Sequence, residues 1–545
     1  MSASCFRKEF FSARSIIFNF IFYPFHVLVF AYGCYSQQTS ARLHALNTLT
    51  YSVWVSRGAA LVLACDATLI MLPMLRNIIR IVRPRLSVLI PVDKNVWFHR
   101  QVAYSMAFWT AVHTTAHYVN FIKVERTQLR PELALQIHYS QASGVTGHFM
   151  LFIMIIMYST ATRKIQNECF EAFWYTHHLA FFFMLALFTH ATGCFVRDTP
   201  DPVYSTKFPF YSEQHCLGYE SWRWTIWPFV LYVGERLWRE IQGRKFTRLE
   251  KVLVHPSGAM ELRMIKPSLK FTPGQWVFLQ VPSLSEFQWH PFTISSAPED
   301  PYVSLTISQV GDWTQALGEA VGAGPAVVAA LATAAETSEK QQSADTRGAA
   351  DISMVAPTKQ FYEVVNNTRE FPIVRVDGPY GVTPFASILK HIWYRQRQGK
   401  LHRLRRVEFI WVCRDSAAFA WFQSVLREIE DAQIDPYFLR INMYITQQLN
   451  IDQLYNITIN DSGQEYDTLT HLRSRTLYGR PDFKAIYTRI RGAIETGAFL
   501  GPRESGTISH IGTYFCGPSE LAKIVRENAT ACSTPTARFT FTKHF

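Results

Sequence analysis

Four histidines in two apolar segments are the residues of this chain best suited to chemistry. His99 and His113 occur in WFHRQVAYSMAFWTAVHTTAHYVNF, and His177 and His190 occur in FEAFWYTHHLAFFFMLALFTHATGCF. Polar groups at membrane depth are expensive, so histidines there are candidates for a functional site. His99 and His113 are almost four helical turns apart and share a face, about 21 Å apart along the axis. Opposed by the second pair, they could ligate two six-coordinate b-type haems.

The helical phase of the second pair is imperfect. Thirteen residues separate His177 from His190, which leaves the two well off a common face of an ideal helix. A π-bulge or another local distortion is therefore expected between them, and His178 is an alternative to His177. A proton relay through the same histidines is the competing function.

Two further polar residues are expected near the outer haem. His117 follows His113 by one helical turn, and Arg57 lies early in the preceding apolar segment. Both are therefore placed close to the non-cytosolic pair.

The elements that position these residues are apolar segments before residue 240. Six of them are long enough to cross a hydrocarbon core, which takes about 20 helical residues. They cover residues 15–35, 51–75, 98–121, 144–158, 170–192 and 222–238. The first resembles a signal peptide, but its apolar run is too long and no clear cleavage site follows, so we expect a retained anchor.

Charge and cysteine content narrow the class of protein. The net charge is +12, and much of the excess flanks membrane segments, where the positive-inside rule puts both termini in the cytosol. No nucleic-acid motif accompanies it. Nine cysteines occur without a CxxC pair, which argues against a zinc ribbon. Cys194 and Cys216 fall in a non-cytosolic loop, where either a disulfide or two free thiols is compatible with the compartment.

After residue 240 the pattern changes to short alternating strands. KVLVH, MELRMIK, WVFLQV, VSLTISQV and FPIVRVDGP favour a small antiparallel barrel. Within it, HPFTISSAPED offers a Pro-fixed turn and hydroxyl donors that suit a flavin and its pyrophosphate, although HPFT alone is more typical of a plain strand and turn. Later, VEFIWVCRD, RINMYIT, TLYGRP and IGTYFCGPSELAKIV alternate with helical stretches. They predict a parallel sheet with ligands at the carboxyl ends of its strands.

Two arginines follow hydrophobic runs in this last part of the chain. Arg414 ends the WVCRD strand and Arg480 follows TLYG. A guanidinium suits a phosphate group at such a position, although either residue alone is more often a solvated surface charge.

Taken together, the motifs resemble a known family. HPFTISSAPED, GDWT, DGPYG, GVTPFASILK, WVCRD, LYGRP, FCGP, a terminal aromatic residue and the FWYTHH helix resemble the NADPH oxidases, especially those of filamentous fungi. The resemblance covers nearly the whole chain. It implies that electrons pass from cytosolic NADPH through FAD and two b-type haems to dioxygen, producing superoxide, in a plasma membrane or an endomembrane.

The resemblance also implies a domain organisation. Residues 1–240 form a six-helix haem-binding transmembrane domain, and residues 241–380 form an FAD-binding β-barrel with an Ala-rich insert at about 315–360. Residues 381–545 form an α/β NADPH-binding domain that is truncated at its N-terminus. The low-complexity insert predicts a flexible cytosolic loop.

The resemblance also assigns functional roles to individual residues of this chain. His99 and His177 resemble the ligands of the cytosolic-side haem, His113 and His190 those of the outer haem, and Arg57 with His117 the polar pair beside the oxygen site. The flavin motif corresponds to His290, Pro291, Phe292 and Thr293, and the aromatic residue that covers the flavin to Phe545. The NADPH positions correspond to Thr383, Pro384, Arg414, Arg480, Cys516, Gly517 and Pro518.

One departure from the family concerns the junction DGPYGVTPFASILK. In the family, a linker, the first strand of the NADPH sheet and a Gly-rich turn separate DGPYG from GVTPF, whereas here Gly381 serves both motifs. Loss of that strand removes a ladder of hydrogen bonds and the phosphate-binding turn at a helix N-terminus. The shared glycine favours a splice or gene-model join over a genuine variant.

Alternative functions and partners complete the expectations. One alternative is a ferric or cupric metalloreductase, for which the loop 198–216 offers scattered acids and one histidine. Another is a catalytically impaired haem membrane protein, because of the deletion at 381. The resemblance implies a small membrane adaptor protein, a cytosolic activator and a Rho-family small GTPase as partners, besides membrane lipid and dioxygen.

Overall fold

The computed structural model divides the chain into two compact units, Met1–Trp238 and Arg239–Phe545. It describes residues 13–40, 46–86, 95–127, 133–140, 142–190, 197–198, 215–216, 222–255, 258–330, 362–364, 370–380, 385–401, 404–414, 420–432, 438–446, 465–467, 470, 472–497 and 508–543. Most of the Ala-rich insert and the Cys194 position lie outside these ranges, so the predictions for them stay predictions.

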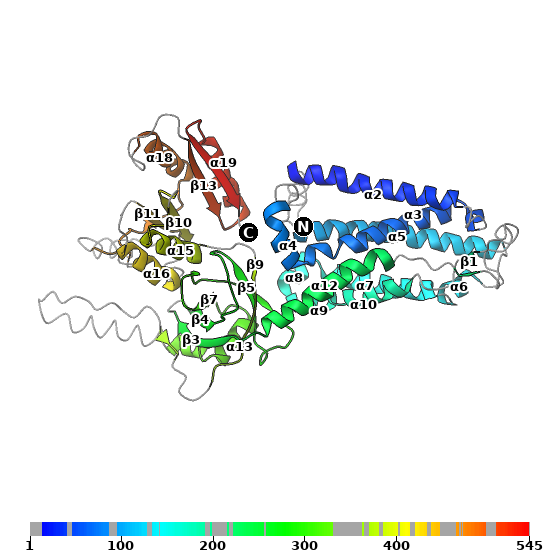
Figure 1. Cartoon of the computed structure of the whole chain (residues 1–545), viewed down its shortest axis with the longest axis horizontal. Coiled ribbons are helices and arrows are strands. Elements are labelled where there is room, and N and C mark those ends of the chain that lie inside the picture. Colours follow the sequence, from blue (N-terminus) through cyan, green and yellow to red (C-terminus); the bar gives the residue numbers. More distant parts are fainter. Residues whose placement is uncertain are drawn as a thin grey trace, which may run out of the picture. The chain divides into compact units, whose positions relative to one another are not determined.

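The first unit is helical (Figure 1). Its long helices are α2 (Ala13–Thr39), α3 (Tyr51–Leu69), α5 (Asn95–Arg126), α7 (Ala142–Thr160) and, reaching into the second unit, α12 (Trp222–Gly243). Helix α9 (Phe170–His177) is followed almost directly by α10 (Ala180–His190). Shorter helices connect them: η2 (Leu46–Leu49), η3 (Leu72–Met74), α4 (Arg76–Leu86), α6 (Ala134–Ser140) and α8 (Arg163–Glu168).

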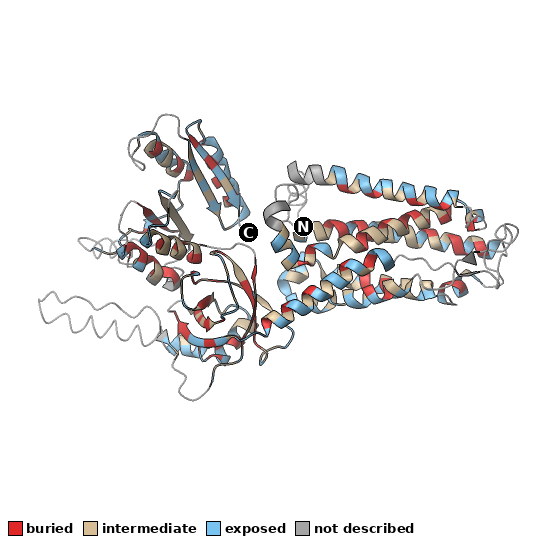
Figure 2. Ribbon diagram, viewed as in Figure 1, coloured by how far each residue is buried: buried red, intermediate tan, exposed pale blue. Residues whose placement is uncertain are grey.

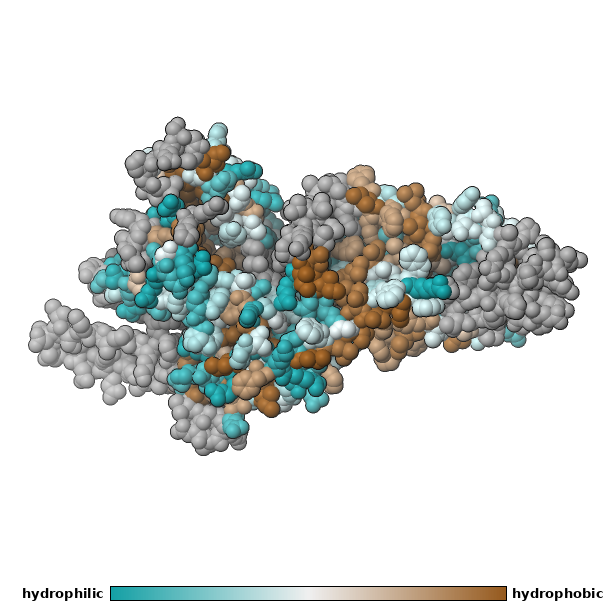
Figure 3. All heavy atoms as spheres, viewed as in Figure 1, coloured by the Kyte–Doolittle hydropathy of each residue, from teal (hydrophilic) through white to brown (hydrophobic). Residues whose placement is uncertain are grey.

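Helix packing in this unit leaves apolar side chains on the outside. Helix α3 packs against α2 and α5, and α7 packs against α10. Phe20 and Leu28 of α2 are 74% and 68% exposed, and hydrophobic residues cover much of the face of this unit that Figure 3 shows. Figure 2 shows the buried residues on the facing sides of the helices. An apolar exterior around a polar-containing interior is typical of a bundle that faces lipid.

Helices occur in all six segments that the sequence predicted to cross a membrane. Three helical stretches of the described residues are long and apolar enough to span one, namely Tyr51–Met74, Ala142–Thr160 and Phe170–His190. A membrane-spanning unit is therefore supported, whereas the count of six spans stays a prediction.

The second unit begins with two antiparallel sheets. One has the order β7-β4-β3-β8 and the other β6-β5-β9. Their strands are β3 (Arg248–Val254), β4 (Met260–Ile265), β5 (Trp276–Gln280), β6 (His290–Thr293), β7 (Val303–Ile307), β8 (Tyr362–Glu363) and β9 (Arg375–Tyr380). Helix α13 (Asp312–Ala320) follows β7. The two sheets enclose one core that includes the fully buried Val252, Leu262, Leu279 and Leu305.

The predicted closed barrel was wrong for the described residues. The two sheets join through a single bridge between Ile294 and Leu305. A barrel requires every strand to pair on both edges, but β8 has only two residues and pairs with β3 alone, and β9 pairs with β5 alone, within the described ranges. The arrangement is therefore two packed sheets that are joined by one β-bridge.

The rest of the second unit contains two separate parallel sheets. One has the order β10-β11-β12, made of Val407–Cys413, Leu439–Ile445 and Leu477–Tyr478. The other pairs β13 (Ser509–Phe515) with β14 (Ala537–Lys543). The accompanying helices are α15 (Ala386–Arg397), α16 (Ala420–Asp431), α18 (Phe483–Glu495) and α19 (Ser519–Ala531).

This division is what the loss of a central strand produces. In a doubly wound sheet the first strand lies between the second and the fourth. Residues 381–385 alone separate β9 from α15, too few for a linker, a strand and a Gly-rich turn. All seven residues of β10 are half-buried, although its continuous apolar run is typical of a strand covered on both faces. The departure predicted at Gly381 itself stays a prediction, because residues 381–384 lie outside the described residues.

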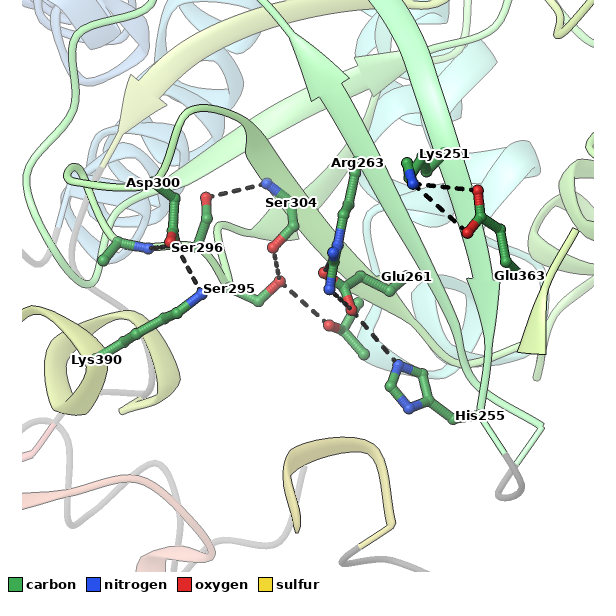
Figure 4. Close-up of polar contacts among 12 residues, drawn as sticks. Lys251, His255, Glu261, Arg263, Ser295, Ser296, Asp300, Ser304, Glu363 and Lys390 are labelled. Carbon is green, nitrogen blue, oxygen red and sulfur yellow. Dashed lines mark hydrogen bonds and ion pairs between the residues drawn. The ribbon is translucent and has the colours of Figure 1, made fainter. Parts of the chain in front are cut away.

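A partly buried carboxylate on β4 makes the stability of the second unit depend on pH. Glu261 accepts from Arg263 Nε at 2.8 Å, and His255 Nε2 lies 3.7 Å from its other oxygen (Figure 4). Burial alone raises the pKa of this carboxyl, but the His255 imidazole and the Arg263 guanidinium outweigh it and lower the pKa to about 2 from the ordinary 4.5.

We predict that Glu261 contributes stability above pH 4.5 and that this contribution is lost as the pH falls from 4.5 towards 2. A shift of this size corresponds to about 3 kcal/mol. Thermal unfolding of the wild-type protein and of Glu261→Gln, followed across this range, should give curves whose difference shrinks at low pH. Parallel pH profiles for the two proteins would contradict the assignment.

Candidate functional site

The structure brings the four predicted histidines together as two pairs. The ring centres of His99 on α5 and His177 on α9 are 6.1 Å apart. Those of His113 on α5 and His190 on α10 are 6.3 Å apart. Each pair therefore joins α5 to one of the two segments of the 170–190 stretch.

A break between α9 and α10 makes this pairing possible. Leu179 N donates to Thr176 O at 3.1 Å, and Phe181 N donates to His178 O at 3.0 Å, which are tight i→i+3 bonds. The distortion expected from the sequence is thus present, and it offsets the poor phase of thirteen residues. His178 is exposed, and its Nδ1 contacts Trp174 O of its own helix, so the structure directs His177 rather than His178 towards His99.

Hydrogen bonds orient three of the four rings. His99 Nδ1 donates to Ile70 O at 2.9 Å, and His113 Nδ1 donates to Ser56 O at 3.0 Å. His190 Nδ1 lies 2.9 Å from Thr146 Oγ1. A carbonyl only accepts, so Nε2 of His99 and of His113 keeps a free lone pair. The buried Nδ1 of His177 has no hydrogen-bond partner among the described residues.

The spacing within each pair fits a six-coordinate iron. An iron midway between two ring centres about 6 Å apart would lie about 3 Å from each, which is a metal–nitrogen bond of about 2 Å plus about 1 Å to the ring centre. Neutral imidazoles with an anchored Nδ1 and a free Nε2 are the usual arrangement of a histidine ligand. The donor set of both pairs therefore fits bis-imidazole haem.

A cavity of about 980 Å³ lies beside the outer pair, at the upper end of the range for ligand pockets of about 300–1,000 Å³. Its lining includes Arg57, His113, His117 and His190. The His117 ring is 4.5 Å from the His113 ring. A Cβ on Gly147 would approach His190 Cε1 to 3.2 Å. The predicted oxygen-site residues and the outer pair thus share one cavity.

The predicted flavin motif forms strand β6, at the edge of its sheet. The His290 ring stacks on the Trp313 ring of α13, with centres 4.0 Å apart and planes 25° apart. Phe292 lies 6.0 Å from the same indole in a near-parallel orientation. Pro291 and Thr293 pair with Phe278 and Trp276 of β5. Trp313 was missed by the sequence analysis, although it belongs to the quoted GDWT motif.

Hydroxyl and acidic residues after β6 form a polar network (Figure 4). Ser295 Oγ and Ser304 Oγ are 2.8 Å apart, and Ser296 Oγ accepts from Ser304 N at 3.0 Å. Asp300 accepts from Ala297 N at 2.8 Å, which fixes the turn of the SSAPED segment. The hydroxyls expected to face a flavin pyrophosphate therefore also hold β6 against β7.

Asp300 also connects the flavin-motif turn to α15. Lys390 Nζ donates to Asp300 Oδ2 at 2.8 Å, and Tyr394 OH donates to Oδ1 at 2.9 Å. Sequence reasoning quoted both partner segments, HPFTISSAPED and GVTPFASILK, but did not identify this contact.

The predicted NADPH residues fall at the carboxyl ends of two separate sheets. Arg414 follows β10 and Arg480 follows β12, and both are exposed. Cys516, Gly517 and Pro518 follow β13, with Gly517 at a φ of 153° and Pro518 at the N-cap of α19. Thr383, Pro384 and Phe545 lie outside the described residues. The structure thus groups the two arginines on one sheet and the FCGP turn on the other.

Comparison with known proteins identifies the family. Three family models match: the ferric reductase like transmembrane component over residues 64–188, an FAD-binding domain over 244–384 and the ferric reductase NAD binding domain over 373–530. The chain is 30% identical to a superoxide-generating NADPH oxidase heavy chain of Dictyostelium discoideum, covering 92% of this chain and 91% of that protein.

The chain belongs to the NADPH oxidase family. NADPH oxidase 1 of Rattus norvegicus is 29% identical, with 94% of each chain covered. NADPH oxidase 3 of Homo sapiens is 28% identical, again with 94% of each covered. This NADPH oxidase is accordingly a membrane oxidoreductase with FAD-binding and NAD-binding domains, in which electrons pass from NADPH through FAD towards oxygen.

Proposed function

We propose that this NADPH oxidase holds two b-type haems and reduces dioxygen to superoxide on the non-cytosolic side of the membrane. The observation that carries the proposal is the pair of histidine distances, 6.1 and 6.3 Å. A resident haem supplies one-electron transfer, so two of them would connect a two-electron flavin to a one-electron acceptor.

The chain's own residues would hold the haems in place. His99 and His177 would ligate the cytosolic-side haem, and His113 and His190 the outer one. The carbonyls of Ile70 and Ser56 fix the tautomer on α5, and Thr146 orients His190. Gly147 leaves room beside the His190 ring, because any larger residue would contact it.

The oxygen site would lie in the cavity beside the outer pair. Arg57 and His117 line it together with His113 and His190. A guanidinium in a site of low dielectric favours an anion, so Arg57 would attract superoxide as its charge develops. The metalloreductase alternative depends on the loop 198–216, most of which lies outside the described residues, whereas the relatives above are oxidases.

The flavin would bind at β6 in the 241–380 domain. His290 to Thr293 present an edge strand whose imidazole is held by Trp313, and the Ser295 and Ser296 hydroxyls follow it. Phe545 would cover the flavin ring. The small membrane adaptor protein, the cytosolic activator and the Rho-family GTPase remain proposals that rest on family membership, as do the 1–240 and 381–545 domain bounds. The cytosolic termini remain a proposal that rests on the basic residues flanking the membrane segments.

The split parallel sheet favours a second proposal about the chain as it stands. One helix is expected to present its N-terminus to the NADPH pyrophosphate. It begins at Ala386, and only five residues separate it from β9. Lys390 and Tyr394 also tie this helix to Asp300. Without a preceding strand and Gly-rich turn, its amide donors would be misdirected, so NADPH reduction would be impaired while the haem helices are unaffected.

Replacing His113 with Leu should remove the outer haem, because Nε2 of this residue would be one of its two axial ligands. The haem content should fall from two to about one per chain. Haem is measured by the pyridine haemochrome absorbance of purified protein. Two haems per chain in this variant would reject the assignment.

A matched pair of neighbouring residues tests the inner site. His177→Leu should lose the cytosolic-side haem, whereas His178→Leu should keep both haems, because the His178 side chain is exposed and turned away. The reduced haem spectrum of both variants decides between them. Loss of haem from His178→Leu alone would assign the ligand to the other residue.

The 545-residue chain should contain haem that dithionite reduces but NADPH does not. Loss of two charge-assisted hydrogen bonds at roughly 1.5–3 kcal/mol each weakens NADPH binding by at least about a hundredfold. Inserting a strand and Gly-rich turn after Tyr380 should restore NADPH oxidation. Measurable NADPH-dependent superoxide from the unaltered chain would show this to be wrong.

A further inference from the structure

A buried histidine–carboxylate pair lies among α2, α3 and α5, apart from the four haem-site histidines. His26 Nε2 is 2.8 Å from Asp66 Oδ1, and Ser105 Oγ donates to Asp66 Oδ2 at 2.8 Å. Asp66 is 0% exposed and His26 is 1% exposed. Asp66 falls within the membrane-spanning stretch Tyr51–Met74, where an ionisable group is expensive and marks a functional site.

The hydrogen bonds of His26 define one exchangeable proton. Nδ1 lies 2.6 Å from Phe22 O, and a carbonyl only accepts, so Nδ1 carries a hydrogen. Nε2 faces a carboxyl oxygen, so a second hydrogen must lie between Nε2 and Oδ1; without it, two lone pairs would face each other. With this proton the pair is neutral, and without it the pair carries one negative charge.

The titratable groups around the pair are uncharged when protonated, so this one proton sets the net charge of the cluster. Among the described residues, the other titratable side chains that interact with Asp66 are Tyr23 of α2, Cys65 of α3 and Tyr158 of α7, and Tyr104 of α5 interacts in turn with Tyr23 and Tyr158. All four are phenols or thiols, which are uncharged in their protonated forms. Tyr23 OH donates to Gln101 Oε1 at 3.0 Å rather than to Asp66.

The pair lies at a depth between the two histidine pairs. Ser105 follows His99 by six residues and precedes His113 by eight on α5, or about 9 Å and 12 Å along the axis. Asp66 O accepts from Ile70 N at 2.8 Å, and Ile70 O accepts from His99 Nδ1 at 2.9 Å. Charges in such an interior interact strongly, because the effective dielectric constant is low.

We propose that the His26–Asp66 pair binds one proton whose affinity rises when an electron occupies the neighbouring haem site. The inference rests on the proposed haem function. When the pair is deprotonated, arrival of one electron draws one proton from water, which forms an N–H or O–H bond at the pair. The added charges of −1 and +1 cancel inside the membrane, and departure of the electron releases the proton.

Potentiometric titration of the haems at several pH values tests the proposal. In wild type the midpoint potential of at least one haem should fall with rising pH by up to about 59 mV per unit, since tenfold in proton concentration corresponds to that value for a one-electron couple. Asp66→Asn should flatten this slope. The matched control Thr68→Val, on the same helix with its hydroxyl bound to Ala64 O and Trp224 O, should keep it.

Equal slopes in wild type and Asp66→Asn, or a flat profile in wild type, would overturn the proposal. Haem content is measured first: absence of haem from wild type refutes the proposed function, whereas two haems with equal slopes refute this inference alone. If Asp66→Asn does not assemble, the redox-difference infrared spectrum of wild type decides. A carboxyl or imidazole band that shifts in D₂O is expected, and its absence counts against the pair.

Discussion

An imidazole buried in a helix bundle is costly unless its nitrogens are bound, and this constraint positions the helices of the first unit. The Ile70 and Ser56 carbonyls bind Nδ1 of His99 and His113, which sets α3 against α5. The remaining nitrogens face α9 and α10, whose break after His177 gives each ring its partner across a gap that fits one iron. The proposed electron transfer across the membrane depends on this one arrangement.

Backbone groups also need hydrogen-bond partners, and this requirement explains the arrangement of the second unit. The edges of strands need partners. The two sheets pack around the core of Val252, Leu262 and Leu279 and hold β6 with its stacked imidazole. In the parallel sheets, β10 and β13 each pair on one edge within the described residues. The two antiparallel sheets are thus a packed scaffold, whereas no strand joins the two parallel sheets within the described residues.

The local sequence pattern was sufficient to predict features that depend on the spacing of residues along the chain. The histidine pairs and the distortion between His177 and His190 followed from counting residues, whereas the strand expected to be missing at Gly381 stays a prediction. Barrel closure did not, because it depends on the two-residue length of β8, which no periodicity reveals. The contacts of Trp313 and Asp300 join segments distant in sequence. The His26–Asp66 pair was missed because each residue stands alone in its apolar segment and only their contact reveals the site.

The most direct test of the account is the ligation of iron in the purified, oxidised protein. Low-temperature electron paramagnetic resonance, with haem quantified on the same sample, reports the axial ligands without any substitution. We predict two low-spin ferric signals of bis-imidazole type for each chain, one from each histidine pair. A high-spin signal that accounts for the haem, or a stoichiometry of one haem or none, would contradict the paired-histidine site.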